Sequence, residues 1–172
     1  MPERFSHSDL RFQPYSGEKL PDYFEYEAAD KDLAEFYNED AEKYQNESIT
    51  KVINVFYGDR LVAYYAYTSS EIRKSELRVD DKVAPFPHPA IKLGRLLVCN
   101  TQRHRGIGRT IIEDIVSRAL EARRVMPLRF LIVDSKPNSI GFYTKLGFVD
   151  PDVKQKHERI LKLLYIDLKP YA

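Results

Sequence analysis

A short basic stretch that contains two glycines, between positions 103 and 109, is the part of this sequence best suited to bind an anion. From Ile107 onward, apolar residues recur at the three- and four-residue spacing of a buried helical face, so the stretch opens a predicted helix. The first backbone N–H groups of a helix have no partner within it, and the helix dipole favours negative charge at that end. Glycines and basic side chains at this point therefore predict a cradle for a polyanion such as a pyrophosphate. The candidate binding residues of the stretch are Arg103, His104, Arg105, Gly106, Ile107, Gly108 and Arg109.

Two common phosphate-binding motifs do not fit this stretch. A P-loop requires Gly-Lys-Ser/Thr, which does not follow, and a dinucleotide fingerprint requires three glycines, of which only two can be placed. What remains is R-x-x-G-x-G between a predicted strand and a predicted helix. Here the sequence resembles the GNAT superfamily of acyl-CoA-dependent N-acetyltransferases, whose pyrophosphate-binding signature is Q/R-x-x-G-x-G/A. The resemblance implies acetyl-CoA as the cosubstrate and no metal.

A second match to the same family lies downstream, at positions 138–148. The run Asn-Ser-Ile-Gly-Phe-Tyr-Thr-Lys-Leu-Gly-Phe resembles a later family motif, a short helix that ends in F-Y-x-x-L-G-F. Gly147 fits the C-cap of that helix. The resemblance implies that Tyr143 is catalytic and protonates the leaving thiolate, and that Phe142 contacts the cofactor. A plain packing role for Tyr143 beside Phe142 stays open.

Asn138 has two readings. The resemblance makes it a cofactor-binding candidate, but relatives commonly carry the asparagine that contacts the cofactor arm seven residues before the tyrosine. Lys136 occupies that position here, and Asn138 lies five residues before Tyr143. A helix N-cap role for Asn138 is equally open.

The strand predicted from Ala90 to Val98 leads into the glycine stretch. The resemblance implies that backbone groups of Leu97 and Val98 bind the pantetheine arm and polarise the carbonyl. No Asp or Glu lies on this strand, where some relatives carry a general base. Deprotonation of the acceptor amine is therefore left to an acidic residue elsewhere, to ordered water, or to an amine of low pKa.

Composition predicts one domain that spans residues 1–172, with disorder left open for residues 1–8. The net charge is +1, so the whole molecule does not attract nucleic acid or membranes electrostatically. A single cysteine, Cys99, excludes an intrachain disulfide, and we expect it to be a buried residue at a strand end rather than a reactive thiol. The N-terminus shows no signal peptide, and no apolar run could span a bilayer. We expect a cytoplasmic monomer or homodimer without a membrane partner.

The predicted elements form an α/β (α+β) fold: a mixed, mostly antiparallel sheet flanked by helices, as in the GNAT fold. By the resemblance, the strand before the glycine stretch and the strand at 128–133 diverge, and acyl-CoA lies in the opening. Asp32 and Glu35 have capping-box spacing at the start of the first helix. The expected elements are a strand at 10–14, a helix from 32, a hairpin at 51–57 and 60–68, polar or proline-rich loops at 69–81 and 85–89, a helix from 107 to about 124, a buried strand at 128–133, a short helix near 138–146, a strand start at 148–149, a charged loop at 154–159 and a last strand at 160–168.

We expect an N-acetyltransferase in which a primary amine, on a small molecule or a peptide, attacks the thioester directly. Between Glu18 and Glu47 there are eleven acidic residues against three lysines, and such a rim at the acceptor entrance would attract cations and repel phosphates. Two alternatives remain: a toxin-type enzyme that acetylates aminoacyl-tRNA, and a non-catalytic acyl-CoA-binding module. "ED-A-x-x-YQ" in the first helix and "LGRL-x-V" before the glycine stretch resemble GNAT toxins of toxin-antitoxin pairs. Ala28-Ala29 stand where those relatives carry Cys-Gly.

Overall fold

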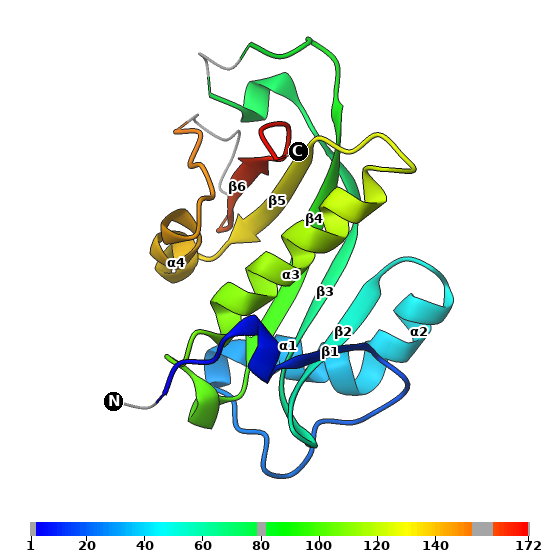
Figure 1. Cartoon of the computed structure of the whole chain (residues 1–172), viewed down its shortest axis with the longest axis vertical. Helices are drawn as coiled ribbons and strands as arrows, with labels where there is room; N and C mark the ends of the chain where they lie inside the picture. The colour runs from blue at the N-terminus through cyan, green and yellow to red at the C-terminus, as the bar shows by residue number, and fades with distance from the viewer. Residues whose placement is uncertain (1–2, 79–81, 153–159, 172) are drawn as a thin grey trace. The chain divides into compact units, whose positions relative to one another are not determined.

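The computed structural model of the chain describes residues 3–78, 82–152 and 160–171, and it has the mixed architecture predicted from the sequence. Six strands form one sheet in the order β1 to β6 (Figure 1). The β4–β5 pair is parallel, and the pairs β1–β2, β2–β3 and β5–β6 are antiparallel. No helix among these described residues is long and apolar enough to cross a membrane. The elements are β1 (Arg11–Pro14), α1 (Lys31–Glu35), the π-helix η3 (Phe36–Asp40), α2 (Ala41–Asn46), β2 (Lys51–Tyr57), β3 (Arg60–Ile72), β4 (His88–Val98), α3 (Ile107–Ala122), β5 (Phe130–Ser135), α4 (Ile140–Lys145) and β6 (Lys162–Asp167), with short 3-10 turns at His7–Asp9, Ala28–Asp30, Lys74–Glu76, Asn100–Gln102 and Pro137–Ser139.

Several boundaries differ from the predicted ones. β3 continues to Ile72, inside the segment expected to be a loop, because Ile72 is fully buried and belongs to a hydrophobic cluster. β4 begins at His88 and includes Pro89, which a strand tolerates in its first residues. Val149 makes only an isolated bridge to Tyr165 rather than starting a strand. The charged loop expected at 154–159 lies wholly within residues 153–159, which are outside the described residues.

Contacts divide the chain into two compact units, each built from two segments. The first unit comprises Met1–Thr68 and Gly94–Glu113, and the second comprises Ser69–Leu93 and Asp114–Ala172. Because β3, β4 and α3 cross these boundaries, each of them contributes residues to both units.

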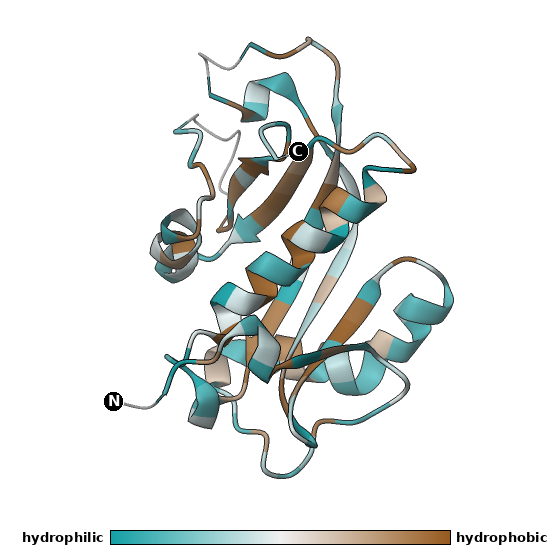
Figure 2. Cartoon of the chain, in the orientation of Figure 1, coloured by the Kyte–Doolittle hydropathy of each residue, from teal (hydrophilic) through white to brown (hydrophobic). Residues whose placement is uncertain are grey.

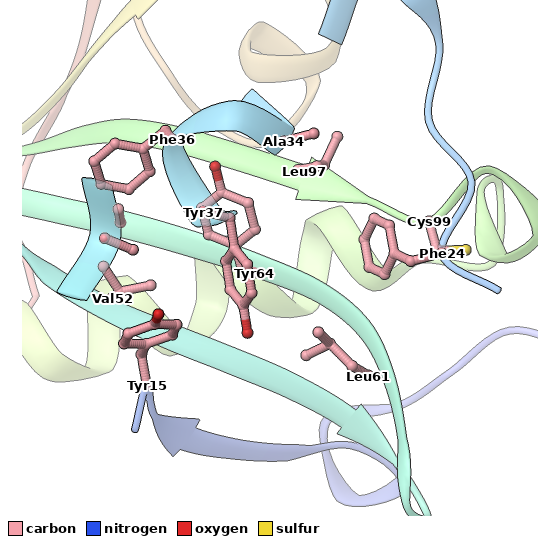
Figure 3. Close-up of a cluster of buried hydrophobic side chains, with 12 residues drawn as sticks. Tyr15, Phe24, Ala34, Phe36, Tyr37, Val52, Leu61, Tyr64, Leu97 and Cys99 are labelled. Atoms are coloured by element: carbon pink, nitrogen blue, oxygen red, sulfur yellow. The ribbon is translucent and has the colours of Figure 1, made fainter. Parts of the chain in front are cut away.

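An aromatic core fills the first unit, between the helical segment 31–46 and strands β2 to β4 (Figure 3). Tyr37 lies edge-on to Tyr15, with ring centroids 5.2 Å apart, and its hydroxyl donates to Asn54 Oδ1 at 2.9 Å. The Tyr64 hydroxyl donates to the Leu33 carbonyl at 2.6 Å. Burial raises the pKa of both Tyr37 and Tyr64 far above the ordinary value, so both stay protonated donors.

The helical segment 31–46 begins at Lys31, one residue before the predicted start, and without the predicted capping box. The N-cap is Asp30, and neither a box between Asp32 and Glu35 nor any side-chain cap bond is formed there. Asp30 instead contacts Arg103, as described below. In the π-helix, Asn38 Oδ1 accepts a hydrogen bond from the Leu20 N–H at 2.8 Å.

In the second unit, β5 is a buried strand as its composition predicts, but it covers Phe130–Ser135 instead of 128–133 and lies beside the edge strand β6 instead of at the centre of the sheet. It pairs with β4 over Ala90–Leu93 and with β6 over the full length of both strands. Leu131 is fully buried, and the apolar character of β5 is visible in Figure 2. Arg129, just before β5, makes two hydrogen bonds of 2.7 Å to the Asp167 carboxylate on β6.

From residue 3 onward the N-terminal segment makes specific contacts, and the disorder left open for residues 1–8 stays a prediction. A 3-10 turn covers His7–Asp9, with Asp9 accepting hydrogen bonds from Ser6. Phe5 is buried at 9% exposure, and its N–H donates to the Arg105 carbonyl at 2.8 Å.

Candidate active site

Two backbone hydrogen bonds hold the chain at the point where β4 ends and the glycine loop begins. The Cys99 N–H donates to the Val62 carbonyl at 2.9 Å, and the Asn100 N–H donates to the Glu25 carbonyl at 2.8 Å. Leu97 is buried, as its place in the core requires, and Val98 is half-buried. The Leu97 side chain therefore serves packing, and the backbone role expected for Leu97 and Val98 stays a prediction.

Cys99 is buried, which agrees with the structural role expected for it. Its Sγ lies 3.3 Å from Thr101 Oγ1 and 3.9 Å from the Tyr23 carbonyl. A thiol in this position packs at a strand end and is not presented to solvent.

Two left-handed residues shape the loop. His104 has φ 62° and Gly106 has φ 85°, and such values cost little only for glycine and for a few polar residues. α3 then begins at Ile107, and the Thr110 N–H donates to the Gly106 carbonyl at 3.1 Å. The backbone N–H groups of residues 107–109 therefore form the first turn of a 16-residue helix, where acceptors within the helix are lacking. This geometry is compatible with the anion cradle predicted from the sequence, and the Ile107 side chain is buried.

The basic side chains of the loop divide into two pairs. Arg103 is ion-paired with Asp30 at 2.6 Å and with Glu27 at 3.0 Å, so it holds the start of the helical segment 31–46. Arg105 donates to Gln102 Oε1 at 2.7 Å and to a backbone carbonyl of the N-terminal segment.

The other pair faces solvent. His104 is exposed, and Arg109, whose side chain is 68% exposed, makes only a weak i,i+4 ion pair with Glu113 at 3.4 Å. Among the basic side chains of the loop, His104 and Arg109 are therefore the two most exposed to solvent.

In the second unit, Tyr143 lies on the short helix α4, whose C-cap is Leu146. Gly147, expected to be the C-cap, follows Leu146 in the left-handed conformation, with φ 97°. The Tyr143 ring makes edge-on contacts with Phe142 at 5.0 Å and Phe148 at 5.3 Å. Burial raises the pKa of Tyr143 to about 12. The side chain thus has both a packing role and a hydroxyl that stays protonated at neutral pH.

Asn138 does not cap a helix. It lies inside the 3-10 turn Pro137–Ser139, whose N-cap is Lys136, while Ser139 is the N-cap of α4. Asn138 is exposed, and its Oδ1 accepts a long hydrogen bond of 3.5 Å from Ser139 Oγ. Within the described residues, no three His, Cys, Asp or Glu side chains are grouped so that they could hold a metal ion.

Sequence reasoning missed the contacts that hold the loop. Asp30 and Arg103 are 73 positions apart, and Phe5 and Arg105 are 100 positions apart, so no local pattern links them. Only the motif residues themselves could be found from spacing.

Comparison with known proteins gives a consistent family. A family model described as "Acetyltransferase (GNAT) domain" matches residues 13–165. The fold is similar to that of AtaT in complex with acetyl-methionyl-tRNAfMet, with TM-score 0.78, 17% identity, and 94% of this chain and 96% of that chain covered. It is also similar to AtaTR bound with AcCoA, with TM-score 0.73, 17% identity and coverage of 95% and 96%.

A tyrosine-to-phenylalanine mutant of KacT is a further neighbour, with TM-score 0.76, 19% identity and coverage of 94% and 96%. A search of curated proteins gave no match. The family model covers most of the chain, and the helix-opening glycine loop and the F-Y-x-x-L-G-F helix are both present with the geometry described above. This chain is therefore a member of the GNAT acetyltransferase family.

Proposed function

We propose that the protein transfers the acetyl group of acetyl-CoA to the α-amino group of an aminoacyl-tRNA by direct attack of the amine on the thioester. The observation that carries this proposal is the composition of β4. Between His88 and Val98 the strand carries no carboxylate, so the position where some relatives place a general base is filled by apolar, basic and glycine residues. An acceptor that is already neutral suits such a site best.

The ordinary pKa of each amine class decides which acceptor qualifies. An α-amino group has a pKa of about 7.8, so about a third of it is neutral at pH 7.5. A lysine amine has a pKa of about 10.4, so only about 0.1% of it is neutral at the same pH. The α-amine thus has an advantage of roughly 250-fold before any catalytic base acts.

The residues of the chain would act at three places. The N–H groups of residues 107–109, with Arg109 and His104, would hold the diphosphate of acetyl-CoA, and backbone groups of Leu97 and Val98 would align the thioester arm. When the amine nitrogen bonds to the carbonyl carbon, the C–S bond breaks and its electron pair goes to sulfur. The Tyr143 hydroxyl then protonates the thiolate, and solvent takes the extra ammonium proton and restores the phenol.

Likeness of fold supports an RNA-linked acceptor. AtaT, whose fold this chain shares, was solved with an acetylated methionyl-tRNA. The acidic segment that argues against RNA is partly neutralised in the fold, because Glu27 and Asp30 are paired with Arg103 and Glu35 is paired with Lys31 at 3.4 Å.

A second candidate acceptor is a cationic small amine or a lysine-bearing peptide. It is favoured by the acidic side chains of the helical segment 31–46 that remain exposed, which include Glu39 and Glu42. Exposed carboxylates raise the local concentration of cations at low salt.

One assay separates the two candidates. The chain is incubated with labelled acetyl-CoA and four acceptors: methionyl-tRNA, the same tRNA without its amino acid, methionine amide, and a lysine peptide with a blocked N-terminus. We expect methionyl-tRNA to be acetylated fastest, methionine amide slowly, and the uncharged tRNA not at all. Faster acetylation of the lysine peptide, abolished when Glu35, Glu39 and Glu42 are changed together to Gln, would refute the tRNA proposal and establish the second candidate.

A further inference from the structure

The contacts of Phe5 point to a role for the N-terminal segment in the acetyl-CoA site. The Arg105 guanidinium lies over the Phe5 ring, 4.0 Å from its centroid, and Arg105 Nε donates to the Glu3 carbonyl at 3.1 Å. In return, the Phe5 N–H donates to the Arg105 carbonyl at 2.8 Å. Three separate contacts therefore join residues 3–5 to one residue of the glycine loop.

These contacts hold the loop where its backbone conformation is least favourable. Arg105 stands between His104 and Gly106, the two residues with left-handed backbone, and a Cβ placed on Gly106 would meet the Phe5 carbonyl oxygen at 3.5 Å. The Phe5 ring is itself packed against Tyr57, with centroids 4.8 Å apart, at the end of β2. The sheet thus supports Phe5, and Phe5 supports the loop.

We propose that residues 3–5 form a clasp that presets the acetyl-CoA loop, and that Phe5 and Arg105 are positioning residues rather than phosphate ligands. Without the clasp, the loop would have to be ordered by acetyl-CoA itself, and the cost of ordering would appear as weaker binding. Chemistry at saturating acetyl-CoA would be nearly unchanged, because the bound loop reaches the same conformation. The inference rests on the proposed placement of acetyl-CoA at this loop.

The test measures binding of CoA by calorimetry, without any acceptor, and then the KM for acetyl-CoA and kcat. A cation–π contact contributes about 1 kcal/mol or more when partly desolvated, which corresponds to about fivefold in an equilibrium constant. Phe5→Ala should therefore raise both the Kd for CoA and the KM for acetyl-CoA about fivefold or more, with kcat within about twofold. Phe5→Tyr should keep wild-type values. Phe12→Ala is the matched control, because this aromatic residue of β1 stacks on His7 instead of on Arg105.

A double-mutant cycle distinguishes a clasp from independent ligands. Arg105→Lys keeps the charge but loses the planar stack, so it should reproduce the effect of Phe5→Ala, and the two changes together should be no worse than either alone. Additive losses would mean that Arg105 binds phosphate by itself and would overturn the proposal. So would a folded Phe5→Ala protein with wild-type affinity.

Gly108→Glu is the reference for the cofactor site itself. If it abolishes CoA binding while Phe5→Ala does nothing, the clasp is refuted and the site stands. If Gly108→Glu binds CoA normally, the placement of acetyl-CoA is refuted, and the clasp with it. Both results come from CoA binding alone, so they do not depend on whether the acceptor is methionyl-tRNA.

Discussion

Removal of a single oxygen atom from Tyr143 tests the proposed proton donor most directly. Tyr143→Phe keeps the ring and therefore both edge-on contacts, at 5.0 Å with Phe142 and 5.3 Å with Phe148. Stability should thus be nearly unchanged, and the loss should fall on chemistry. General-acid catalysis is worth roughly a hundredfold or more, so we expect kcat to fall by at least about 100-fold, with the Kd for CoA unchanged.

The raised pKa of Tyr143 adds a second, independent expectation. With a pKa of about 12, the phenol is only about 1% ionised at pH 10, whereas an ordinary tyrosine would be half ionised there. A thiol has a pKa of about 8.5, well below the raised pKa of Tyr143, so full proton transfer from this phenol to a thiolate is uphill. Tyr143 should therefore act mainly by hydrogen bonding to the sulfur as charge develops, with the proton passing late.

Thiol release is followed from pH 6 to pH 10 for the wild type and for Tyr143→Phe, at saturating acetyl-CoA. The rate of the wild type should not fall at alkaline pH through ionisation of Tyr143, because the hydroxyl stays protonated up to pH 10. The wild type and Tyr143→Phe should therefore have the same shape of pH profile at alkaline pH. Full turnover by Tyr143→Phe would show that the hydroxyl has no catalytic role and that Tyr143 serves packing alone. An alkaline limb near pH 10 that is present in the wild type and absent from the variant would refute the burial argument.

Three further outcomes are expected. Gly108→Glu should abolish CoA binding, measured by calorimetry, while circular dichroism stays unchanged, because a carboxylate would face the diphosphate at the helix N-terminus. Gly147→Ala should lower the free energy of unfolding by about 1–2 kcal/mol in urea titrations, because φ 97° is left-handed backbone that a Cβ penalises. Burial alone would raise the pKa of Asp167, but hydrogen bonds from Arg129 and from a backbone N–H hold it below the ordinary value. The resulting stabilisation is present above about pH 4 and is lost as pH falls through the depressed pKa, so Asp167→Asn should flatten the acid limb of stability against pH.

Motifs and periodicity predicted the parts of the site that depend on residues adjacent in the sequence. The glycine loop, the helix that begins at Ile107 and the glycine after α4 all follow from local backbone requirements, which a sequence records directly. The partners of the basic side chains could not be predicted in the same way. Arg103 looks like a phosphate ligand in sequence, yet Asp30 and Glu27 hold it, and these are partners that only the fold brings near.

Element boundaries failed for a related reason. Asp32 and Glu35 have the spacing of a capping box, but the helix begins one residue earlier because Ala28–Asp30 form a 3-10 turn that leads into it. Likewise, the polar residues 69–71 carry no strand pattern, and only the burial of Ile72 explains why β3 continues through them.

The π-helix at Phe36–Asp40 divides the first helical segment into two registers. A π-turn holds one residue more than a regular α-turn, and each residue of an α-helix rotates the chain by about 100°. If the same residues were wound as a regular α-helix, the extra residue would turn α2 by about a quarter of a circle and carry Ala41 away from the core that buries it, so the π-turn keeps Ala41 facing that core. A homologue that is one residue shorter in this stretch could therefore replace the π-turn with a regular α-turn and still place the same face of α2 on the aromatic core.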